Sequence, residues 1–241
     1  MYFEEYGKSE NPTIIMLHGA FFTDTYGRQY ALSNQYHLII PHIKGFGKTA
    51  NDTFVIDDVI LELNDFIKSY APVYLVGFSL GAQLAFKLLA ESPELFKKAI
   101  IVSPWLVNKD EITDDVMNGN LKMLSQLKNR ILCRMIGISS GMPKQKITEM
   151  VDSMQNITEQ TVRNCVDNKI SFDTVNGFEE CEVPVLALAG KSEPEDIQNS
   201  VKRMADLNKY CTCEIWAKAK HNIPTAFAKK FNQSIISFFD Y

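Results

Sequence analysis

The stretch "VYLVGFSLGAQLAF", residues 73–86, joins a short apolar run to the pattern Gly-x-Ser-x-Gly. An apolar run of this length is typical of a buried strand, and the residues after Ser79 favour a helix. A serine raised on a sharp turn between strand and helix needs strained backbone angles, and small residues two before and two after it avoid a clash. Gly77 and Gly81 meet that requirement. The stretch therefore predicts a strand, a turn that exposes Ser79, and a helix.

The helix after Ser79 would aim its first amides at negative charge that develops beside the serine. The pattern alone occurs often by chance, but the small residues Ala82 and Ala85 would let the helix pack closely on the strand before it. The alternative interpretation is a turn whose serine caps the helix. On the first interpretation Ser79 is a candidate nucleophile.

Short apolar runs alternate with helical patterns along much of the chain, which is typical of a parallel sheet wrapped by helices. Most of these runs are apolar throughout, as expected of strands that are buried on both faces. The expected strands are residues 13–18, 36–42, 72–77, 98–103, 183–189 and 211–216, and the expected helices include 54–70, 79–91 and 224–239. The predicted fold class is α/β.

The alternation breaks between Trp105 and Glu182, where the sequence shows no convincing strand and predicts two to four helices. Methionine fills irregular apolar gaps and adapts its shape, so the segment is expected to form a lid over an apolar pocket. A small helical subdomain with its own core is an equal alternative. The expected domains are a core of residues 1–104 and 183–241 and an inserted lid of residues 105–182. Six of the nine methionines fall in this lid: Met117, Met123, Met135, Met142, Met150 and Met154.

The composition is that of an ordinary soluble domain, with 46% hydrophobic and 22% charged residues and a net charge of −4. Lysines and arginines are scattered, which argues against a nucleic-acid surface or a polybasic membrane patch. No apolar run approaches the roughly 18 residues of a membrane span, and acids occupy the N-terminal segment where a signal peptide needs basic residues. We therefore expect a cytoplasmic protein.

The five cysteines show no Cys-x-x-Cys spacing. Cys211 and Cys213 lie two apart on an expected strand, so their side chains face the same way. Such a pair can suit a metal or a disulfide-like contact, but two buried thiols on one strand face are the favoured interpretation.

Four landmarks follow one another in the sequence: "IIMLHGAFF" (14–22), "LIIPHIKGFGKT" (38–49), "GFSLG" (77–81) and "IWAKAKHNIPTAF" (215–227). In these the chain resembles the α/β-hydrolase superfamily over essentially its whole length, least well in the lid. The resemblance implies a mostly parallel sheet of about seven strands flanked by helices. One edge strand of the family's usual eight is expected to be missing, because only "MYFEEY" precedes the loop at residues 7–12.

The resemblance also implies roles for the histidines. His221, in a loop after the last strand, is the candidate base, with a surface histidine at a helix start as the alternative. His18 is expected to support the oxyanion loop, and His37 to begin a strand. His42 departs from the family, which usually has an aspartate there, and the change is expected to alter a loop contact. The backbone amides of Ala20 (or Phe21) and Leu80 would form the oxyanion hole.

The acid that orients His221 is expected in "GKSEPED", residues 190–196. By resemblance the matching position is Glu193, where aspartate is commoner. Pro194 disfavours a helical backbone at the residue before it and suits the first helical position, so Glu193 stands at a helix entrance. Glu195 and Asp196 fall in the first turn, where acids complement the helix dipole. Glu193 is the first candidate and Asp196 the second.

These residues predict a serine hydrolase that cleaves a small to medium apolar ester or thioester through an acyl-enzyme on Ser79. C–C bond hydrolysis, a proton-abstracting lyase and a non-catalytic ligand-binding member of the fold remain alternatives. No metal or organic cofactor is implied, the partner is a small acyl substrate, and the oligomeric state is left open. "GFGKT" lacks the further glycines of a phosphate-binding or dinucleotide-binding loop. The expected pocket residues are Phe21, Phe22, Phe46, Phe78 and Trp105.

Overall fold

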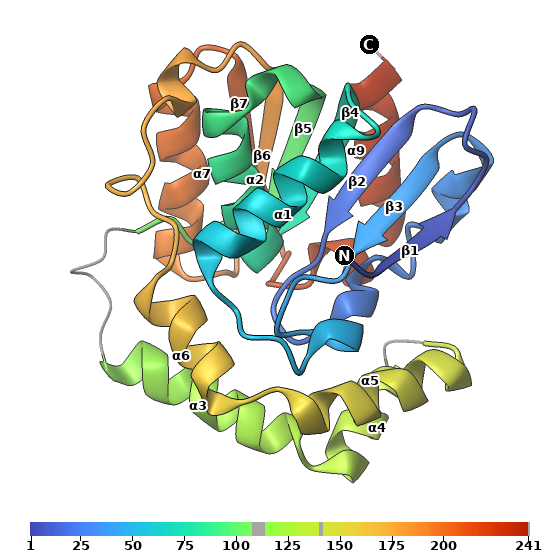
Figure 1. Ribbon diagram of the computed structural model, residues 1–241. Coiled ribbons are helices and arrows are strands. Elements are labelled where there is room, and N and C mark those ends of the chain that lie inside the picture. Colours follow the sequence, from blue (N-terminus) through green and yellow to red (C-terminus); the bar gives the residue numbers. More distant parts are fainter. Residues whose placement is uncertain (108–113, 140–141, 241) are drawn as a thin grey trace.

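The computed structural model describes residues 1–107, 114–139 and 142–240. Its centre is a seven-stranded sheet in the order β1-β3-β2-β4-β5-β6-β7 (Figure 1). β1 pairs antiparallel with β3, and the other pairings in this sheet are parallel. The prediction of a mostly parallel sheet of about seven strands is confirmed. The strands are β1 (Phe3–Tyr6), β2 (Thr13–Leu17), β3 (His37–Pro41), β4 (Val73–Phe78), β5 (Phe96–Val102), β6 (Val185–Gly190) and β7 (Cys211–Trp216).

Helices cover both faces of the sheet (Figure 1). Successive side chains of a strand point to opposite faces, so a strand between two helical layers is apolar at every position. Along β2, Ile15 and Leu17 pack in one apolar core, whereas Ile14 and Met16 pack in the other. One layer contains α1 (Ile56–Lys68), α2 (Leu80–Glu91) and α7 (Glu195–Leu207), and the opposite layer contains α9 (Ala228–Asp240).

Strand β7 departs from the apolar pattern because it lies at the edge of the sheet. Cys211 is buried, but Cys213 is exposed, like the residues on either side of it. The expectation of two buried thiols is therefore wrong for Cys213. An edge strand has a neighbour on one side only, so side chains along it can reach solvent.

The C-terminal helix is shorter than expected. The predicted helix 224–239 is divided into α8 (Ile223–Ala226) and α9, with non-helical backbone angles at Phe227. Phe231 and Ile235 are buried against the sheet, as their four-residue spacing indicates. Short 3-10 helices complete the connections: η1 (Thr23–Tyr26), η2 (Tyr30–Asn34), η3 (Gly47–Thr49), η4 (Pro93–Leu95) and η6 (Phe178–Glu180).

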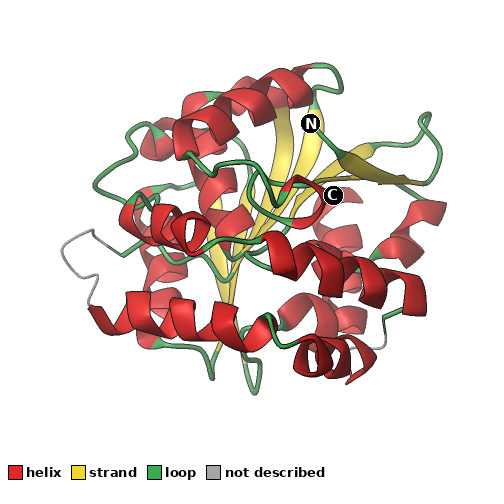
Figure 2. Ribbon diagram, turned by 60° about the horizontal axis from the view of Figure 1, so that its bottom comes forward, coloured by secondary structure: helices red, strands yellow, loops and turns green. Residues whose placement is uncertain are grey.

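A helical insertion lies between β5 and β6, below the carboxyl ends of the strands (Figures 1 and 2). It contains α3 (Asp114–Leu127), α4 (Arg130–Ser139), α5 (Lys144–Asn156) and α6 (Glu159–Asp167). Of the expected lid 105–182, residues 108–113 and 140–141 lie outside the described residues. Most of its buried apolar side chains belong to the same core as one face of the sheet. In the part of the chain that the structure describes, no helix has the length and hydrophobicity needed to cross a membrane.

The sheet also fixes where a ligand can approach. The chain leaves β2 toward β3 on one side, then crosses back to β4 and continues to β5, β6 and β7 on the other. Crevices in open α/β sheets form at the carboxyl ends of strands where the direction of winding reverses. Here that point lies between β2 and β4, so the segment after Leu17 and the turn after Phe78 meet there.

Candidate active site

Ser79 stands on a sharp turn between β4 and α2. Its φ of 54° is in the left-handed region, which is strained for a residue with a side chain. The glycines on either side are needed for close packing. A Cβ on Gly81 would lie 2.1 Å from the Leu17 carbonyl oxygen, and one on Gly77 would lie 2.4 Å from the Gly81 oxygen. The turn thus holds the serine hydroxyl above the carboxyl end of the sheet.

Ser79, His221 and Glu193 form a continuous hydrogen-bonded chain. Ser79 Oγ lies 3.0 Å from His221 Nε2, and His221 Nδ1 lies 2.6 Å from Glu193 Oε1. Because a carboxylate only accepts, Nδ1–H donates to Glu193 and Nε2 is left to accept from the serine hydroxyl. The three side chains come from loops after β4, β7 and β6, and Ser79 lies more than a hundred residues before the other two in the sequence.

Glu193 is the carboxylate that the fold buries. It is 6% exposed, and its Oε2 accepts hydrogen bonds from Ser103 Oγ at 2.9 Å and from the Gly190 N–H at 2.5 Å. Glu195 and Asp196 lie in the first turn of α7 and are exposed. The structure therefore brings Glu193, rather than Asp196, to the imidazole.

Ser103 is a site residue that sequence reasoning missed. It follows directly after β5, is fully buried, and has a φ of 53°. Its backbone N–H donates to the Leu188 oxygen at 2.7 Å, which fixes the hydroxyl beneath Glu193. The available signal was a single polar residue at the carboxyl end of the apolar run "KAIIVS".

Two backbone bonds tie the acid loop to the histidine loop. The Lys191 N–H donates to the Trp216 oxygen and the Ser192 N–H donates to the Ala219 oxygen, both at 2.9 Å. Gly190 permits this approach, since a Cβ there would lie 2.3 Å from the Ala219 oxygen. The pairing of β6 with β7 thus continues into the loops and sets the spacing between carboxylate and imidazole.

Ala20 and Leu80 line the cavity beside Ser79. Neither backbone amide donates a hydrogen bond within the described part of the chain. Gly19 lets this segment approach the turn, because a Cβ there would lie 3.0 Å from the Phe78 ring and 3.2 Å from Ser79 Cβ. Two residues of the Ser79 cavity wall therefore carry backbone amides without a described hydrogen-bond partner.

His18 connects this amide loop to the neighbouring one. Its Nδ1 donates to the Gly19 oxygen at 2.7 Å, and its Nε2 accepts from the Ile43 N–H at 3.0 Å. Burial, and secondarily the nearby His42, lowers the pKa of His18 to about 3. His18 is accordingly neutral and held in one tautomer.

His42 and His37 have structural contacts. His42 Nδ1 accepts from the Lys48 N–H at 3.0 Å, so the residue that replaces the usual aspartate holds the loop before η3. His37 begins β3, as expected, and its Nε2 lies 2.6 Å from Glu5. Neither histidine contacts Ser79 among the interactions that the structure describes.

Comparison with known proteins identifies the family of the fold. A family model described as alpha/beta hydrolase fold matches residues 12–224. The chain belongs to the alpha/beta hydrolase fold family. No curated protein matches its sequence.

Solved structures resemble this alpha/beta-hydrolase over nearly its whole length. A bromoperoxidase from Bacillus anthracis has a TM-score of 0.78 and 16% identity, with 100% of this chain and 95% of that chain covered. An esterase from Exiguobacterium antarcticum has a TM-score of 0.77 and 17% identity, with the same coverage. A variant of the meta-cleavage product hydrolase CumD has a TM-score of 0.75 and 16% identity, covering 99% and 93%. At these identities the likeness shows the fold alone.

A cavity of about 340 Å³ opens beside Ser79 and His221. Burial raises the pKa of the Cys165 thiol, which lines the cavity, so this cysteine stays protonated and is a poor nucleophile beside Ser79. The Oε1 atom of Gln83 is buried in the cavity wall without a hydrogen-bond partner. The lining residues are Ala20, Ser79, Leu80, Gln83, Trp105, Val116, Asn120, Cys165, Val166, Pro194, Asp196, Ile197 and His221.

The aromatic residues expected in this pocket are mostly elsewhere. Trp105 lines the cavity, but Phe21, Phe22 and Phe78 do not. Phe21 is buried and packs edge-on against Phe46, and Phe22 packs on the same core. Phe78 lies on the other face of the sheet, where its ring packs 5.1 Å from the imidazole of His221. The alternation of side chains along β4 turns Phe78 away from the cavity.

The methionines of the insertion do not line the cavity either. Met150 and Met154 are buried in the shared core, whereas Met123 and Met135 are exposed. The expectation that methionines would form the apolar pocket is therefore wrong for the described residues. The insertion instead contributes Val116 and Asn120 from α3 and two residues from α6.

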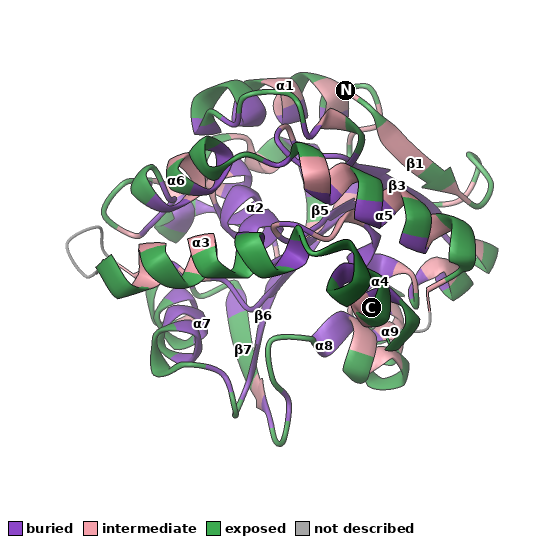
Figure 3. Ribbon diagram, turned by 90° about the horizontal axis from the view of Figure 1, so that it is seen from below, coloured by how far each residue is buried: buried purple, intermediate pink, exposed green. Residues whose placement is uncertain are grey.

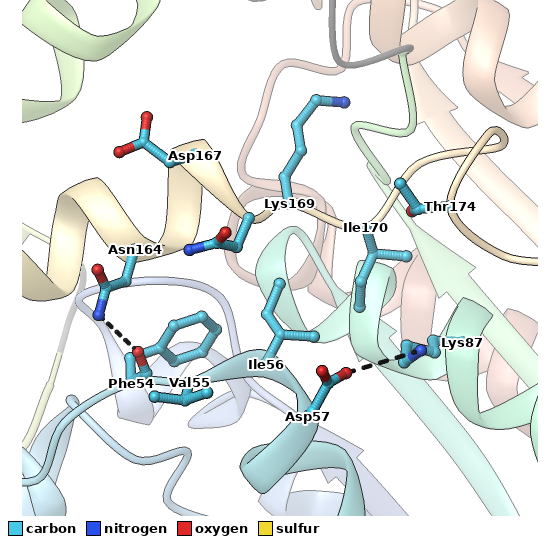
Figure 4. A pocket seen from close by; sticks show the side chains of 11 residues that line it. Phe54, Val55, Ile56, Asp57, Lys87, Asn164, Asp167, Lys169, Ile170 and Thr174 are labelled. Atoms are coloured by element: carbon cyan, nitrogen blue, oxygen red, sulfur yellow. Dashed lines mark hydrogen bonds and ion pairs between the residues drawn. The ribbon is translucent and has the colours of Figure 1, made fainter.

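A larger cavity of about 520 Å³ lies away from Ser79, between the start of α1 and the end of α6 (Figure 4). Several of its polar side chains already bind one another or the backbone. Lys87 pairs with Asp57, and Asn164 Nδ2 donates to the Phe54 oxygen at 2.8 Å (Figure 4). Lys169 donates to the Val107 oxygen and lies over the Trp105 ring. No cluster that could hold a metal ion occurs among the described residues.

Proposed function

We propose that this alpha/beta-hydrolase is a serine hydrolase that cleaves a small to medium apolar carboxylic ester or thioester through an acyl-enzyme on Ser79. The observation that carries this proposal is the chain from Ser79 Oγ through His221 to buried Glu193, at the edge of a cavity with two free amides. Nucleophile, base and orienting acid within hydrogen-bond reach are what acyl transfer requires.

In the proposed first half-reaction, Ser79 Oγ attacks the acyl carbonyl and passes its proton to His221 Nε2. Glu193 holds the Nδ1–H and stabilises the charged imidazolium that forms. His221 then protonates the leaving alcohol or thiol, and the acyl group stays on the serine. In the second half-reaction His221 takes a proton from water, which attacks the acyl-enzyme and releases the acid.

The oxyanion of each tetrahedral intermediate would accept hydrogen bonds from the backbone N–H groups of Ala20 and Leu80. A single donor of this kind contributes about 3 kcal/mol to the barrier reduction in well-studied acyl transfer. Leu80 is the first residue of α2, so the helix dipole adds to its donor strength. His18 supports the other donor by holding the Gly19 oxygen.

The cavity favours an acyl group of modest size. Its volume is near the lower end of small-molecule sites, and its walls are largely apolar. The same three side chains also suit C–C bond hydrolysis and proton abstraction, the chemistries left open by the sequence. We place esters first because the described cavity offers no lysine or arginine side chain to a charged substrate. The apolar side chains that it presents are Leu80, Trp105, Val116, Val166 and Ile197.

We further propose that residues 105–182 form a lid over this site, inserted in a core of residues 1–104 and 183–241. In support, α3 and α6 supply one wall of the cavity. The insertion's buried side chains share a core with the sheet, which favours a lid over a subdomain with a separate core.

All five cysteines are free thiols, in keeping with the proposed location in a reducing cytoplasmic compartment.

Labelling by a fluorophosphonate probe tests the proposal. We expect the wild-type chain to label covalently and Ser79→Ala to lose labelling and at least about 10³-fold in p-nitrophenyl butyrate turnover, since the triad serine is the attacking atom. Cys165→Ser is the matched control, because it changes the only other thiol or hydroxyl side chain among the described lining of the same cavity, and it should label like wild type. Labelling that survives Ser79→Ala would refute the assignment.

A further inference from the structure

Helix α4 presents an apolar face to solvent. Ile131 is 74% exposed, Met135 and Ile138 are each 61% exposed, and Leu132 is 39% exposed. The spacing 131, 135 and 138 places these side chains on one side of the helix. The opposite side is already buried, through Cys133 and Gly137. The α4 face, defined as Ile131, Leu132, Met135 and Ile138, is therefore not the side by which the helix packs on the protein.

The position of α4 leaves this face free. Seen from below, α4 lies in front of the body of the protein and is mostly exposed (Figure 3). Figure 1 shows it at the outer edge of the insertion, on the side away from the sheet. A continuous row of large aliphatic side chains at such a place marks an interaction surface more often than an ordinary surface.

The α4 face lies in an acid-free stretch of the sequence, although α5 beside it supplies Asp152 and Glu149, which pair with Arg130 and Lys146. From Val116 to Thr148 the sequence contains no Asp or Glu, although the whole chain is acidic. On α4 itself, Arg130 and Arg134 flank the apolar row, and Arg130 is paired with Asp152. The basic residues in the acid-free stretch are Lys122, Lys128, Arg130, Arg134, Lys144 and Lys146.

This combination discriminates between possible occupants. A symmetric dimer through the α4 face would bring the same arginines and lysines of two copies together, and like charges oppose such pairing. A helix with an apolar row and basic flanks suits the boundary of a lipid layer, where the apolar side chains enter and the cations meet anionic head groups.

We propose that the α4 face docks the protein reversibly on an anionic lipid surface. This proposal is compatible with the absence of a polybasic patch in the sequence, because the α4 face consists of apolar side chains. Its contact is apolar, with Arg134 and nearby lysines adding a salt-sensitive attraction. At ten residues the helix is only about 15 Å long, so docking inserts one face and spans nothing. The proposal does not depend on the chemistry at Ser79.

Co-sedimentation of the full chain with vesicles tests the proposal. Phosphatidylcholine vesicles containing phosphatidylglycerol should retain the wild-type chain, and phosphatidylcholine alone should retain much less. We expect Ile131→Ser/Met135→Ser/Ile138→Ser to lower the bound fraction at least about fivefold. Arg134→Glu should lower it about fivefold or more, as should salt of about 0.5 M.

Leu61→Ser is the matched control, since Leu61 is a 63% exposed aliphatic residue on α1 with acidic neighbours. It should bind vesicles like wild type, as should Ser79→Ala, which separates this test from the proposed function. All α4 variants should keep wild-type p-nitrophenyl butyrate turnover without vesicles, showing that they fold. Absence of wild-type binding, or equal loss in Leu61→Ser, would overturn the proposal. So would a lipid-free dimer in sedimentation velocity that the triple variant dissociates.

Discussion

The two walls of the Ser79 cavity are built by different forces. On the strand side, Ser79, Glu193 and His221 stand on loops that directional hydrogen bonds tie together, down to the Ser103 hydroxyl under the carboxylate. On the insertion side, Val116 and its neighbours line the cavity, and the helices that carry them are placed by apolar packing. A hydrogen bond fixes distance and angle, whereas apolar packing fixes mainly volume.

This difference predicts a division of labour. Side chains that need a position accurate to a few tenths of an ångström lie where parallel strands and their loop bonds define it. Side chains that only shape a cavity lie on helices whose packing tolerates change. Substitutions on the strand side should therefore reduce kcat, and substitutions on the insertion side should change KM and chain-length preference.

The largest effect in this comparison should come from the carboxylate. We expect Glu193→Gln to lower kcat about 10²–10⁴-fold, because a neutral amide cannot stabilise the imidazolium and can select the wrong tautomer. Asp196→Asn, the matched change in a first-turn acid that lines the cavity, should leave kcat within about twofold, because Asp196 makes no described contact with His221 and touches no group that moves a proton. Steady-state kinetics on p-nitrophenyl butyrate make the measurement. The reverse outcome would show that Asp196 orients the histidine when substrate is bound.

The strand side was also the more predictable from sequence. A turn that needs Gly77 and Gly81, a buried apolar run before it, and a proline that sets off Glu193 each have a local physical cause. The order of the four family landmarks along the sequence also predicted His221 as the base. Ser103 escaped because its role depends on β5 lying beside β6, and the sheet order is not written in any single segment.

The insertion resisted prediction for a physical reason. The sequence predicted helices there and an apolar character, and both appear in the described residues. Which apolar side chains face the cavity depends on how the four helices pack together. In this packing Met150 is buried in the core and Val116 lines the cavity. The same limit applies to Phe21 and Phe78, since an aromatic residue near the serine can face either side of the sheet.

The buried His18 on the strand side should make the free energy of unfolding depend on pH. His18 has a folded-state pKa of about 3, so the unfolded chain takes up this proton first as the pH falls. The stabilisation is complete above the unfolded pKa of about 6.5 and is lost as the pH falls toward 3, by up to about 1.4 kcal/mol per pH unit. Urea unfolding between about pH 6.5 and 5, above the carboxyl range, should show a smaller slope for His18→Gln than for wild type. Equal slopes would mean that the imidazole is protonated in the folded state.

The smallest effect should come from the insertion wall. Val116→Ala removes two methyl groups from the cavity wall, so KM for p-nitrophenyl butyrate should rise about two- to fivefold while the hexanoate ester gains relative to it. The value of kcat should stay within about twofold, because no atom that moves a proton or holds the oxyanion is touched. Asn118→Ala, an exposed change on the same helix, should alter neither constant. A large loss of kcat in Val116→Ala would show that α3 positions the reacting groups, and the two walls would then have to be treated as one rigid unit.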